Sequence, residues 1–190
     1  MMKTVEIQDL TVEYEIITRK VKYWRLEIKN DRLILISPMG FNNHEKIIEK
    51  HEKWIYKKFK EINKKKKCAE LLELNLNQKE SEFRDLVKNL VQVFSNELNV
   101  TVKKVYFKKM KTRWGSCSSK RNISINVYLK YLPETLIEYV VFHEIAHLVE
   151  LNHSKRFWKI VSSKFENYKN LEIELSIYWF AVQDNLVKSS

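Results

Sequence analysis

A chain of 190 residues with 44% hydrophobic and 12% aromatic side chains can bury a core, which excludes a wholly disordered protein. Only 2 glycines and 2 prolines occur, so glycine-rich phosphate or dinucleotide loops are excluded and helices should be plentiful. Lys and Arg outnumber Asp and Glu by 35 to 24, and the formal net charge of +11 predicts solubility while leaving nucleic acid open as a partner through a basic surface.

The first 38 residues alternate apolar and polar side chains, which is the period of β-strands. The alternating apolar positions are Val12, Tyr14, Ile16, Trp24, Leu26, Ile28, Leu33 and Leu35. Asn30 and Asp31 interrupt the pattern, and both residue types tolerate the left-handed backbone conformation of a short hairpin turn. The sequence therefore predicts a small antiparallel sheet and a β-rich N-terminal subdomain over residues 1–40.

Two amphipathic helices are predicted after this sheet. Between residues 43 and 66, apolar side chains recur at spacings of three and four among charged ones. The same spacing returns at Phe83, Leu86, Val87, Leu90, Val91, Phe94 and Leu98. An apolar stripe of this kind is typical of a packed core, so neither helix needs a functional interpretation.

The pattern of apolar residues in the second half of the chain predicts a short sheet followed by buried helices. Residues 104–110 and 122–129 again alternate with a period of two. Pro133 suits the first turn of a helix, which continues to Val149 with apolar side chains on nearly all sides. Ser154 can cap a further helix. We expect an α+β fold that forms a single domain over residues 1–190.

The cysteines and the composition of the N-terminus indicate in which cellular compartment the protein is expected. Cys68 and Cys117 stand far apart and form no C-x-x-C pair, which predicts neither a disulfide framework nor a cysteine zinc knuckle. The N-terminus has no apolar leader, and no apolar run approaches the ~18 residues that cross a bilayer. We expect a cytoplasmic protein that does not enter a membrane.

The segment HEIAH, residues 143–147, matches the pattern H-E-x-x-H inside the predicted buried helix. A spacing of four brings His143 and His147 to one helix face, where both imidazoles can reach one Zn²⁺. Glu144 is offset by one residue, so its carboxylate lies beside the metal without being a ligand. That position suits a base that takes a proton from water at the metal.

A catalytic zinc usually has three protein ligands and keeps a fourth position open. His153 is the candidate for the third, because Asn152 and Ser154 can end one helix and cap the next and so turn the chain back toward the metal. Any one of these histidines alone is more simply interpreted as a core residue. The three together predict one Zn²⁺ per chain, bound by His143, His147 and His153.

Four segments in this order carry a family resemblance: RWGSCS at 113–118, INVYL at 125–129, YVVFHEIAHL at 139–148 and NHSKRFW at 152–158. Together they resemble the YgjP-like zinc metallopeptidase family, which is related to the SprT and WLM families. The resemblance implies a zincin-like helical core in which the H-E-x-x-H helix is buried next to a short sheet. It also implies His143, His147 and His153 as zinc ligands and Glu144 as catalytic acid and base.

The resemblance adds a motif near the metal, formed by Arg113, Trp114, Gly115 and Cys117. The predicted strand at 122–129 is similar to the edge strand along which zincin peptidases bind an extended substrate. Asn126, Arg113 and Trp114 are therefore predicted to contact substrate. We expect Gly115 to serve a strand connection that needs a positive φ angle. For Cys117, a small buried residue is the favoured interpretation, and a thiolate near zinc is the alternative.

The leading functional hypothesis is a zinc-dependent metallopeptidase acting on a peptide or protein. A nucleotide pyrophosphatase is the first alternative, because relatives in the family are sometimes labelled UTP pyrophosphatases. Three histidines on one metal suit zinc hydrolysis of an amide better than a Mg²⁺ site for phosphates, which is built from carboxylates.

The second alternative is a nucleic-acid-associated protease or binding protein that docks through its basic surface. Basic and aromatic residues interleave at Lys103, Lys104, Tyr106, Phe107, Lys108, Lys109, Lys111, Arg113 and Trp114. Alternation in a strand produces the same pattern without nucleic acid, so the pattern leaves both interpretations open.

Overall fold

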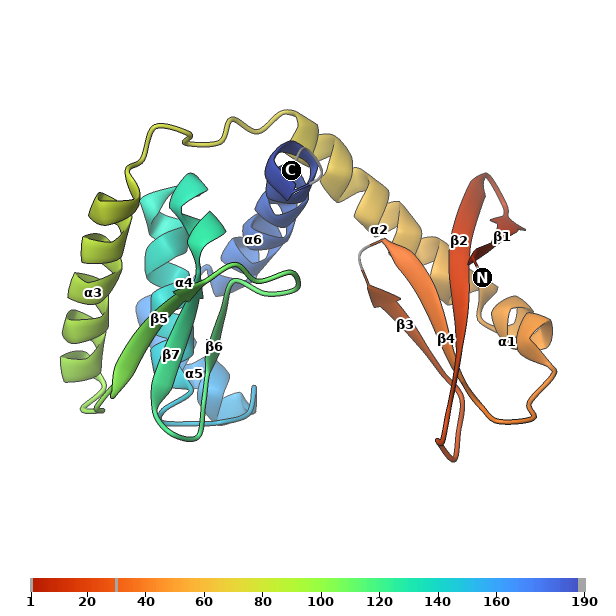
Figure 1. Ribbon diagram of the computed structural model, residues 1–190, viewed down its shortest axis with the longest axis horizontal. Coiled ribbons are helices and arrows are strands. Elements are labelled where there is room, and N and C mark those ends of the chain that lie inside the picture. The colour runs from red at the N-terminus through yellow and green to blue at the C-terminus, as the bar shows by residue number, and fades with distance from the viewer. Residues whose placement is uncertain (1, 30, 188–190) are drawn as a thin grey trace. The chain divides into compact units, whose positions relative to one another are not determined.

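The computed structural model describes residues 2–29 and 31–187. Its strands are β1 (Met2–Ile7), β2 (Leu10–Arg19), β3 (Arg25–Lys29), β4 (Arg32–Pro38), β5 (Lys104–Lys108), β6 (Gly115–Cys117) and β7 (Asn122–Asn126). Its α-helices are α1 (His44–Lys50), α2 (Glu52–Glu70), α3 (Glu80–Glu97), α4 (Glu134–Ala146), α5 (Lys155–Lys164) and α6 (Tyr168–Val182). Helices and two small sheets confirm the predicted α+β class (Figure 1). The chain divides into two compact units, one ending at Lys67 and one beginning at Cys68.

The sheet of the N-terminal unit has the strand order β1-β2-β4-β3. Its β1–β2 and β3–β4 pairs are antiparallel, but β2 and β4 are parallel, so the prediction of a purely antiparallel sheet is wrong. Both faces of β4 carry apolar side chains, whereas β3 begins and ends with a charged one. The more apolar strand therefore takes the inner position, and β3 lies at the edge. Asp31 has the predicted positive φ of 61°, and Asn30 lies outside the described residues.

The helices of the N-terminal unit share a core with its sheet. Ile48 of α1 and Ile55 and Phe59 of α2 pack with Val12 and Leu33. This unit thus extends beyond the predicted subdomain of residues 1–40, because the helices cover the apolar sheet face. The predicted single helix over 43–66 is two helices, and His51 lies between them. The organisation of residues 1–190 as one domain stays a prediction.

In the C-terminal unit, three strands form a sheet in the order β5-β7-β6. Strand β7 pairs in parallel with β5 and antiparallel with β6, so β7 is central. The predicted strand over 122–129 ends at Asn126, where the chain enters a 3₁₀ turn, η1 (Val127–Tyr131). The prediction that this strand is a free edge is therefore wrong. The edge strands are β5 and β6, and the sequence patterns did not predict β6 because three residues are too few to show a period.

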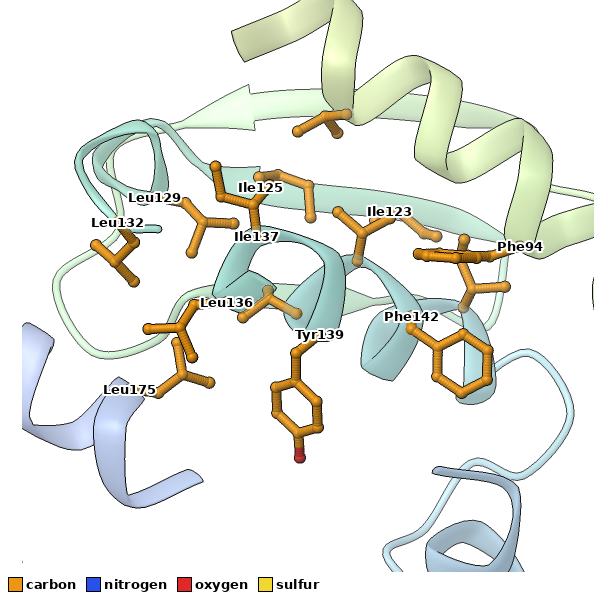
Figure 2. Packing of buried hydrophobic residues seen from close by; sticks show 14 of the residues in the cluster. Phe94, Ile123, Ile125, Leu129, Leu132, Leu136, Ile137, Tyr139, Phe142 and Leu175 are labelled. Atoms are coloured by element: carbon orange, nitrogen blue, oxygen red, sulfur yellow. The ribbon is translucent and has the colours of Figure 1, made fainter. Parts of the chain in front are cut away.

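Helix α4 lies at the centre of the core of this unit. Figure 2 shows Ile123 and Ile125 of β7 and Phe94 of α3 packed about it, while Tyr139 points away from β7. Nine side chains of α4 are buried, which explains why its sequence is apolar on nearly every side. Each large apolar side chain buried in this way contributes roughly 1.5–3 kcal/mol to folding. The helix that carries the H-E-x-x-H motif is thus rigidly held beside a short sheet, as predicted.

The helices after α4 complete this unit. Ser154 caps α5 as predicted, because its side-chain oxygen accepts a hydrogen bond from the N–H of Phe157. The last helix is α6, and a short π-helical segment, η2 (Gln183–Val187), follows it. Among the described residues, no helix combines the length and the apolar character needed to cross a bilayer.

Candidate metal centre

Two of the predicted metal ligands lie at the C-terminal end of α4. His143 belongs to its last turn and His147 is its C-cap residue, and their ring centroids are 5.1 Å apart. The Nδ1 atom of His147 contacts the carbonyl oxygen of Glu150 at 3.2 Å. That contact orients the ring and leaves the Nε2 atom of His147 available to a metal.

The third predicted ligand reaches the same point from the loop between α4 and α5. A tight turn follows α4, in which the N–H groups of Val149 and Glu150 both bind the carbonyl oxygen of Ala146. The Nε2 atom of His153 then lies 2.9 Å from the Nε2 atom of His143. One ligand atom from each of His143, His147 and His153 lies within 4.8 Å of the others. The structure therefore brings together the three histidines named from the sequence.

Aromatic side chains of α5 hold two of these imidazoles. The ring of Phe157 stacks on His147 with centroids 4.4 Å apart, and Trp158 stacks on His153 at 5.5 Å. Stacking of this kind restricts each ring to one orientation, which favours a metal with a fixed geometry. Sequence reasoning gave Phe157 and Trp158 no role at the metal, because their apolar spacing along α5 gives no sign of contact with a ligand.

The electrostatics of the cluster favour the neutral forms of His143 and His147. Burial, together with the neighbouring His147 and His153, lowers the pKa of His143 to about 3. Burial also lowers the pKa of His147. Neutral imidazole is the form that binds metal. Three imidazoles at these separations fit a zinc ion with an open fourth position.

Glu144 lies beside the cluster and is only 7% exposed. Burial raises its pKa to about 8, and the positive charge of Arg113 acts in the opposite direction. A carboxyl group with a pKa near neutrality can both accept and return a proton at working pH.

Gly115 of β6 makes room for this carboxyl group. A Cβ atom at position 115 would lie 2.6 Å from Oε1 of Glu144 and 2.7 Å from its Cγ, which is closer than atoms can approach. The expectation of a positive φ at Gly115 is wrong, since among the described glycines only Gly40 has one. The reason for glycine here is space and not backbone conformation.

A cavity of about 710 Å³ opens at the cluster. Its lining includes the three histidines, Glu144, the residues of β6 and part of α6. Arg113 and Trp114, both predicted to contact substrate, line the cavity. The indole N–H of Trp114 donates to the carbonyl oxygen of Leu175 at 3.2 Å, and its ring meets the ring of Trp179 edge to face. Trp114 thus joins the segment before β6 to α6.

Asn126 does not line the cavity and has no exposed surface. Its side-chain amide donates to the carbonyl oxygens of Met110 and Arg113, at 3.0 and 2.9 Å. Its side-chain oxygen accepts the N–H of Tyr128 at 3.2 Å. Asn126 thus presents no surface to the cavity in this structure, and its contact with a substrate stays a prediction. Asn126 fixes the loop that carries Arg113.

The sequence offers three tyrosines that could stabilise the charge that develops on a substrate oxygen, and it favours none of them: Tyr139, Tyr168 and Tyr178. Only Tyr139 lines the cavity, and its hydroxyl donates to Oε1 of Glu172 at 2.6 Å. Burial and this carboxylate raise the pKa of Tyr139. Tyr168 stacks instead on Trp158. Sequence reasoning missed Glu172, because a single carboxylate gives no signal in a sequence pattern.

Cys117 lines the same cavity and is half-buried. Burial and the nearby charge of Glu144 raise the pKa of its thiol to about 11. Cys117 is not one of the residues whose ligand atoms cluster with the histidines. Its surroundings therefore favour a neutral thiol over a thiolate.

Comparison with known proteins agrees with this geometry. A YgjP-like metallopeptidase domain matches residues 65–178, which is more than half of the chain. The chain belongs to the YgjP-like family. The match begins close to the boundary between the two units, so it falls almost entirely within the unit that holds the histidine cluster.

Individual relatives of this YgjP-like chain are distant. A UTP pyrophosphatase of Escherichia coli K12 is 28% identical over 64 residues, which is 34% of this chain and 38% of that protein. The jannalysin zymogen of Methanocaldococcus jannaschii, a metallopeptidase, is 28% identical with a TM-score of 0.42, over 48% of this chain and 92% of its own. The abylysin zymogen of Pyrococcus abyssi, also a metallopeptidase, is 24% identical with a TM-score of 0.43, over 53% and 95%.

Proposed function

We propose that this protein is a zinc-dependent metallopeptidase with His143, His147 and His153 as zinc ligands and Glu144 as acid and base. The observation that carries the proposal is the convergence of three imidazoles beside a buried carboxyl group in an open cavity. Membership of the YgjP-like metallopeptidase family supports the same chemistry. Zinc, when bound, polarises a carbonyl group and lowers the pKa of an adjacent water.

Glu144 supplies the proton transfers in this proposal. Its carboxylate accepts a proton from the attacking water, and the resulting acid gives that proton to the leaving amine. Burial raises its pKa to about 8, so the protonated form is stable enough to carry the proton between the two steps. Gly115 keeps the carboxyl group in place, because no side chain at position 115 competes for its space.

The position of strand β6 favours a polypeptide as the substrate. Within the described chain β6 pairs only with β7, and all three of its residues line the cavity. An extended peptide can add to such an edge through main-chain hydrogen bonds, which give affinity with little dependence on side chains. Arg113 and Trp114 then lie at the end of this edge, where they would contact the substrate.

The charges that line the cavity suit a nucleoside triphosphate less well than a polypeptide. Arg113 is the only lysine or arginine in its lining, whereas Glu144 and Glu172 are both acidic. A triphosphate carries several negative charges and needs more cations or a metal held by carboxylates. Pyrophosphatase activity is therefore the alternative that a substrate screen must exclude.

Docking of nucleic acid stays a prediction from charge. Residues 98–133 contain nine lysines and arginines and no aspartate or glutamate. If this segment binds DNA, affinity should fall steeply with salt, because neutralised phosphates release counterions. A flat salt response, or no binding near physiological ionic strength, would assign these residues to solubility. We also propose a cytoplasmic location, which the two free cysteines support.

Elemental analysis and a substrate screen test the proposed function. We expect about one zinc per chain in the purified protein. Zinc should be largely lost in His143→Ala and His147→Ala, and reduced in His153→Ala. Zinc affinity should also weaken at acidic pH, where protons compete with the metal for the imidazoles. Because burial lowers the pKa of His143 and His147, protons should displace the metal from these two rings only below the ordinary range of histidine. Full zinc content in the triple variant would overturn the assignment.

The screen should offer the zinc-loaded protein unfolded proteins, peptides and nucleoside triphosphates side by side. Cleavage of polypeptides, lost together with zinc in His143→Ala, supports the peptidase. Release of pyrophosphate without peptide cleavage would replace it with the alternative activity.

A further inference from the structure

The two ring nitrogens of His143 have different surroundings. Its Nε2 atom faces the Nε2 atom of His153 at 2.9 Å and so belongs to the cluster. Its Nδ1 atom is buried and has no hydrogen-bond partner among the described residues. A carboxylate oxygen, Oε1 of Glu172, lies 3.8 Å from that Nδ1 atom. The ring therefore has a metal-binding side and, behind it, a side that faces an acidic group.

Glu172 is held in this position by a buried hydroxyl group. Tyr139 is fully buried, and its hydroxyl donates to Oε1 of Glu172 at 2.6 Å. Both Tyr139 and His143 belong to α4, four residues apart, and their rings are in contact with centroids 5.9 Å apart. Tyr139 points away from β7 (Figure 2). It therefore ties the carboxylate of α6 to the face of α4 that carries His143.

Metal binding through Nε2 places the proton of a neutral imidazole on Nδ1. In His143 that N–H is buried, and a buried donor without an acceptor is costly. Ligand histidines usually donate this proton to a carboxylate or a backbone carbonyl. The other ligand on α4 already has such a partner, because Nδ1 of His147 contacts the carbonyl oxygen of Glu150.

We propose that Glu172, held by Tyr139, is a positioning residue that accepts the Nδ1–H of His143 when zinc is bound. The hydrogen bond fixes the tautomer and the orientation of the imidazole, and its negative charge makes Nε2 a stronger donor to the metal. This inference rests on the proposed zinc site. Glu172 is not itself one of the clustered ligands, and it acts through His143.

Zinc affinity of the full-length chain tests the role directly, measured by competition with a coloured chelator. Removal of such a partner typically weakens metal binding 10- to 100-fold. We expect a loss of this size in Glu172→Ala. Glu172→Gln keeps the shape and one acceptor oxygen without the charge, so its affinity should be intermediate. Tyr139→Phe should cause a smaller loss, because Glu172 remains but is no longer held.

Glu174→Gln is the matched control, since Glu174 lies exposed on the same helix two residues away. It removes the same charge from α6 and should leave zinc affinity unchanged. Equal losses in the Glu172 and Glu174 variants would mean that net charge alone is responsible, and the positioning role would be wrong.

A spectroscopic signature separates positioning from a general structural role. In protein loaded with Co²⁺, the N–H protons of ligand imidazoles give strongly shifted NMR signals that disappear when they exchange quickly with water. The Nδ1–H signal of His143 should be lost or broadened in Glu172→Ala. The corresponding signal of His147 should persist, because its acceptor is a backbone carbonyl.

The outcomes distinguish this inference from the proposed function. If the parent binds zinc tightly and Glu172→Ala binds it equally well with both N–H signals intact, the positioning role fails and the zinc site stands. If the parent protein binds no zinc, both fail together. Selective loss of the His143 signal with weaker zinc binding supports the role.

Discussion

The cavity is built from two parts that differ in how the chain brings them together. The local part is residues 143–158, in which the three histidines, Glu144, Phe157 and Trp158 follow one another along α4, a tight loop and α5. The distant part is residues 112–117 around β6 together with residues 172–179 of α6. The local part supplies the donors for a metal. The distant part supplies the space around Glu144, the edge strand and the carboxylate behind His143.

This difference shows which functions need sequence proximity. Metal ligands spaced by four residues on a helix meet whatever the rest of the fold does. Gly115 contacts Glu144, and Glu172 lies near His143, only because β6 and α6 pack against α4. Loss of a local residue should therefore remove chemistry outright, whereas loss of a distant residue should misplace chemistry that is still present.

The largest expected effect is on the local part, in Glu144→Gln. The amide has nearly the same volume as the carboxyl group but cannot accept a proton from water. Hydrolysis should fall by ~10² to 10⁴, the range for a positioned general base, while zinc content and thermal stability stay near those of the parent. Zinc must be measured in the same samples. Retention of most of the activity would place the base elsewhere.

The matching change in the distant part is Gly115→Ala. The added methyl group would lie 2.6 Å from Oε1 of Glu144, so the carboxyl group must move away. A shift of about 1 Å in a catalytic group can cost about 10²-fold in rate, and we expect a loss of this order with zinc still bound. Ser116→Ala in the same strand is the control and should stay close to the parent. An active Gly115→Ala protein would show that the position of Glu144 is not critical.

The same division explains what the sequence could predict. The local part was predictable, because H-E-x-x-H and the capping residue Ser154 both act within one or two turns of helix. The amphipathic helix α3 and the buried helix α4 were predictable for the same reason, since periodicity reports local structure. No signal of this kind exists for β6, whose three residues find their partner only through β7.

Errors in the predicted sheets have a related cause. Strand order depends on which strand is buried on both faces, and alternation of apolar residues does not report it. Thus β4 lies inside its sheet, where it pairs in parallel with β2, and β7 lies inside the other sheet, which leaves β5 and β6 as its edges. The role of Asn126 in holding a loop could not be predicted for the same reason. Its amide holds a loop that the sequence does not place beside it.

A smaller effect is expected where the loop of the local part is anchored. In Ser154→Ala, α5 loses the side-chain acceptor for the N–H of Phe157, at a typical cost of about 1 kcal/mol in the free energy of unfolding. His153 directly precedes this cap, so zinc affinity should weaken as well. Ser163→Ala, at an exposed position of α5, should change neither quantity. Chemical denaturation and chelator competition measure the two effects. Loss of stability with unchanged zinc affinity would mean that the cap does not position His153.

The smallest expected effect concerns Cys117 in the distant part. Burial and the charge of Glu144 raise the pKa of its thiol to about 11, so almost none of it is thiolate at pH 8. Because the thiolate is the reactive form, we expect zinc-free protein to be alkylated by iodoacetamide at position 117 at least about tenfold more slowly than free cysteine. Peptide mapping by mass spectrometry follows this site separately from Cys68. In Glu144→Gln the negative charge is absent, so alkylation of Cys117 should become faster. An unchanged rate there would mean that burial alone controls the thiol, and that the local and distant parts are not coupled electrostatically at this point.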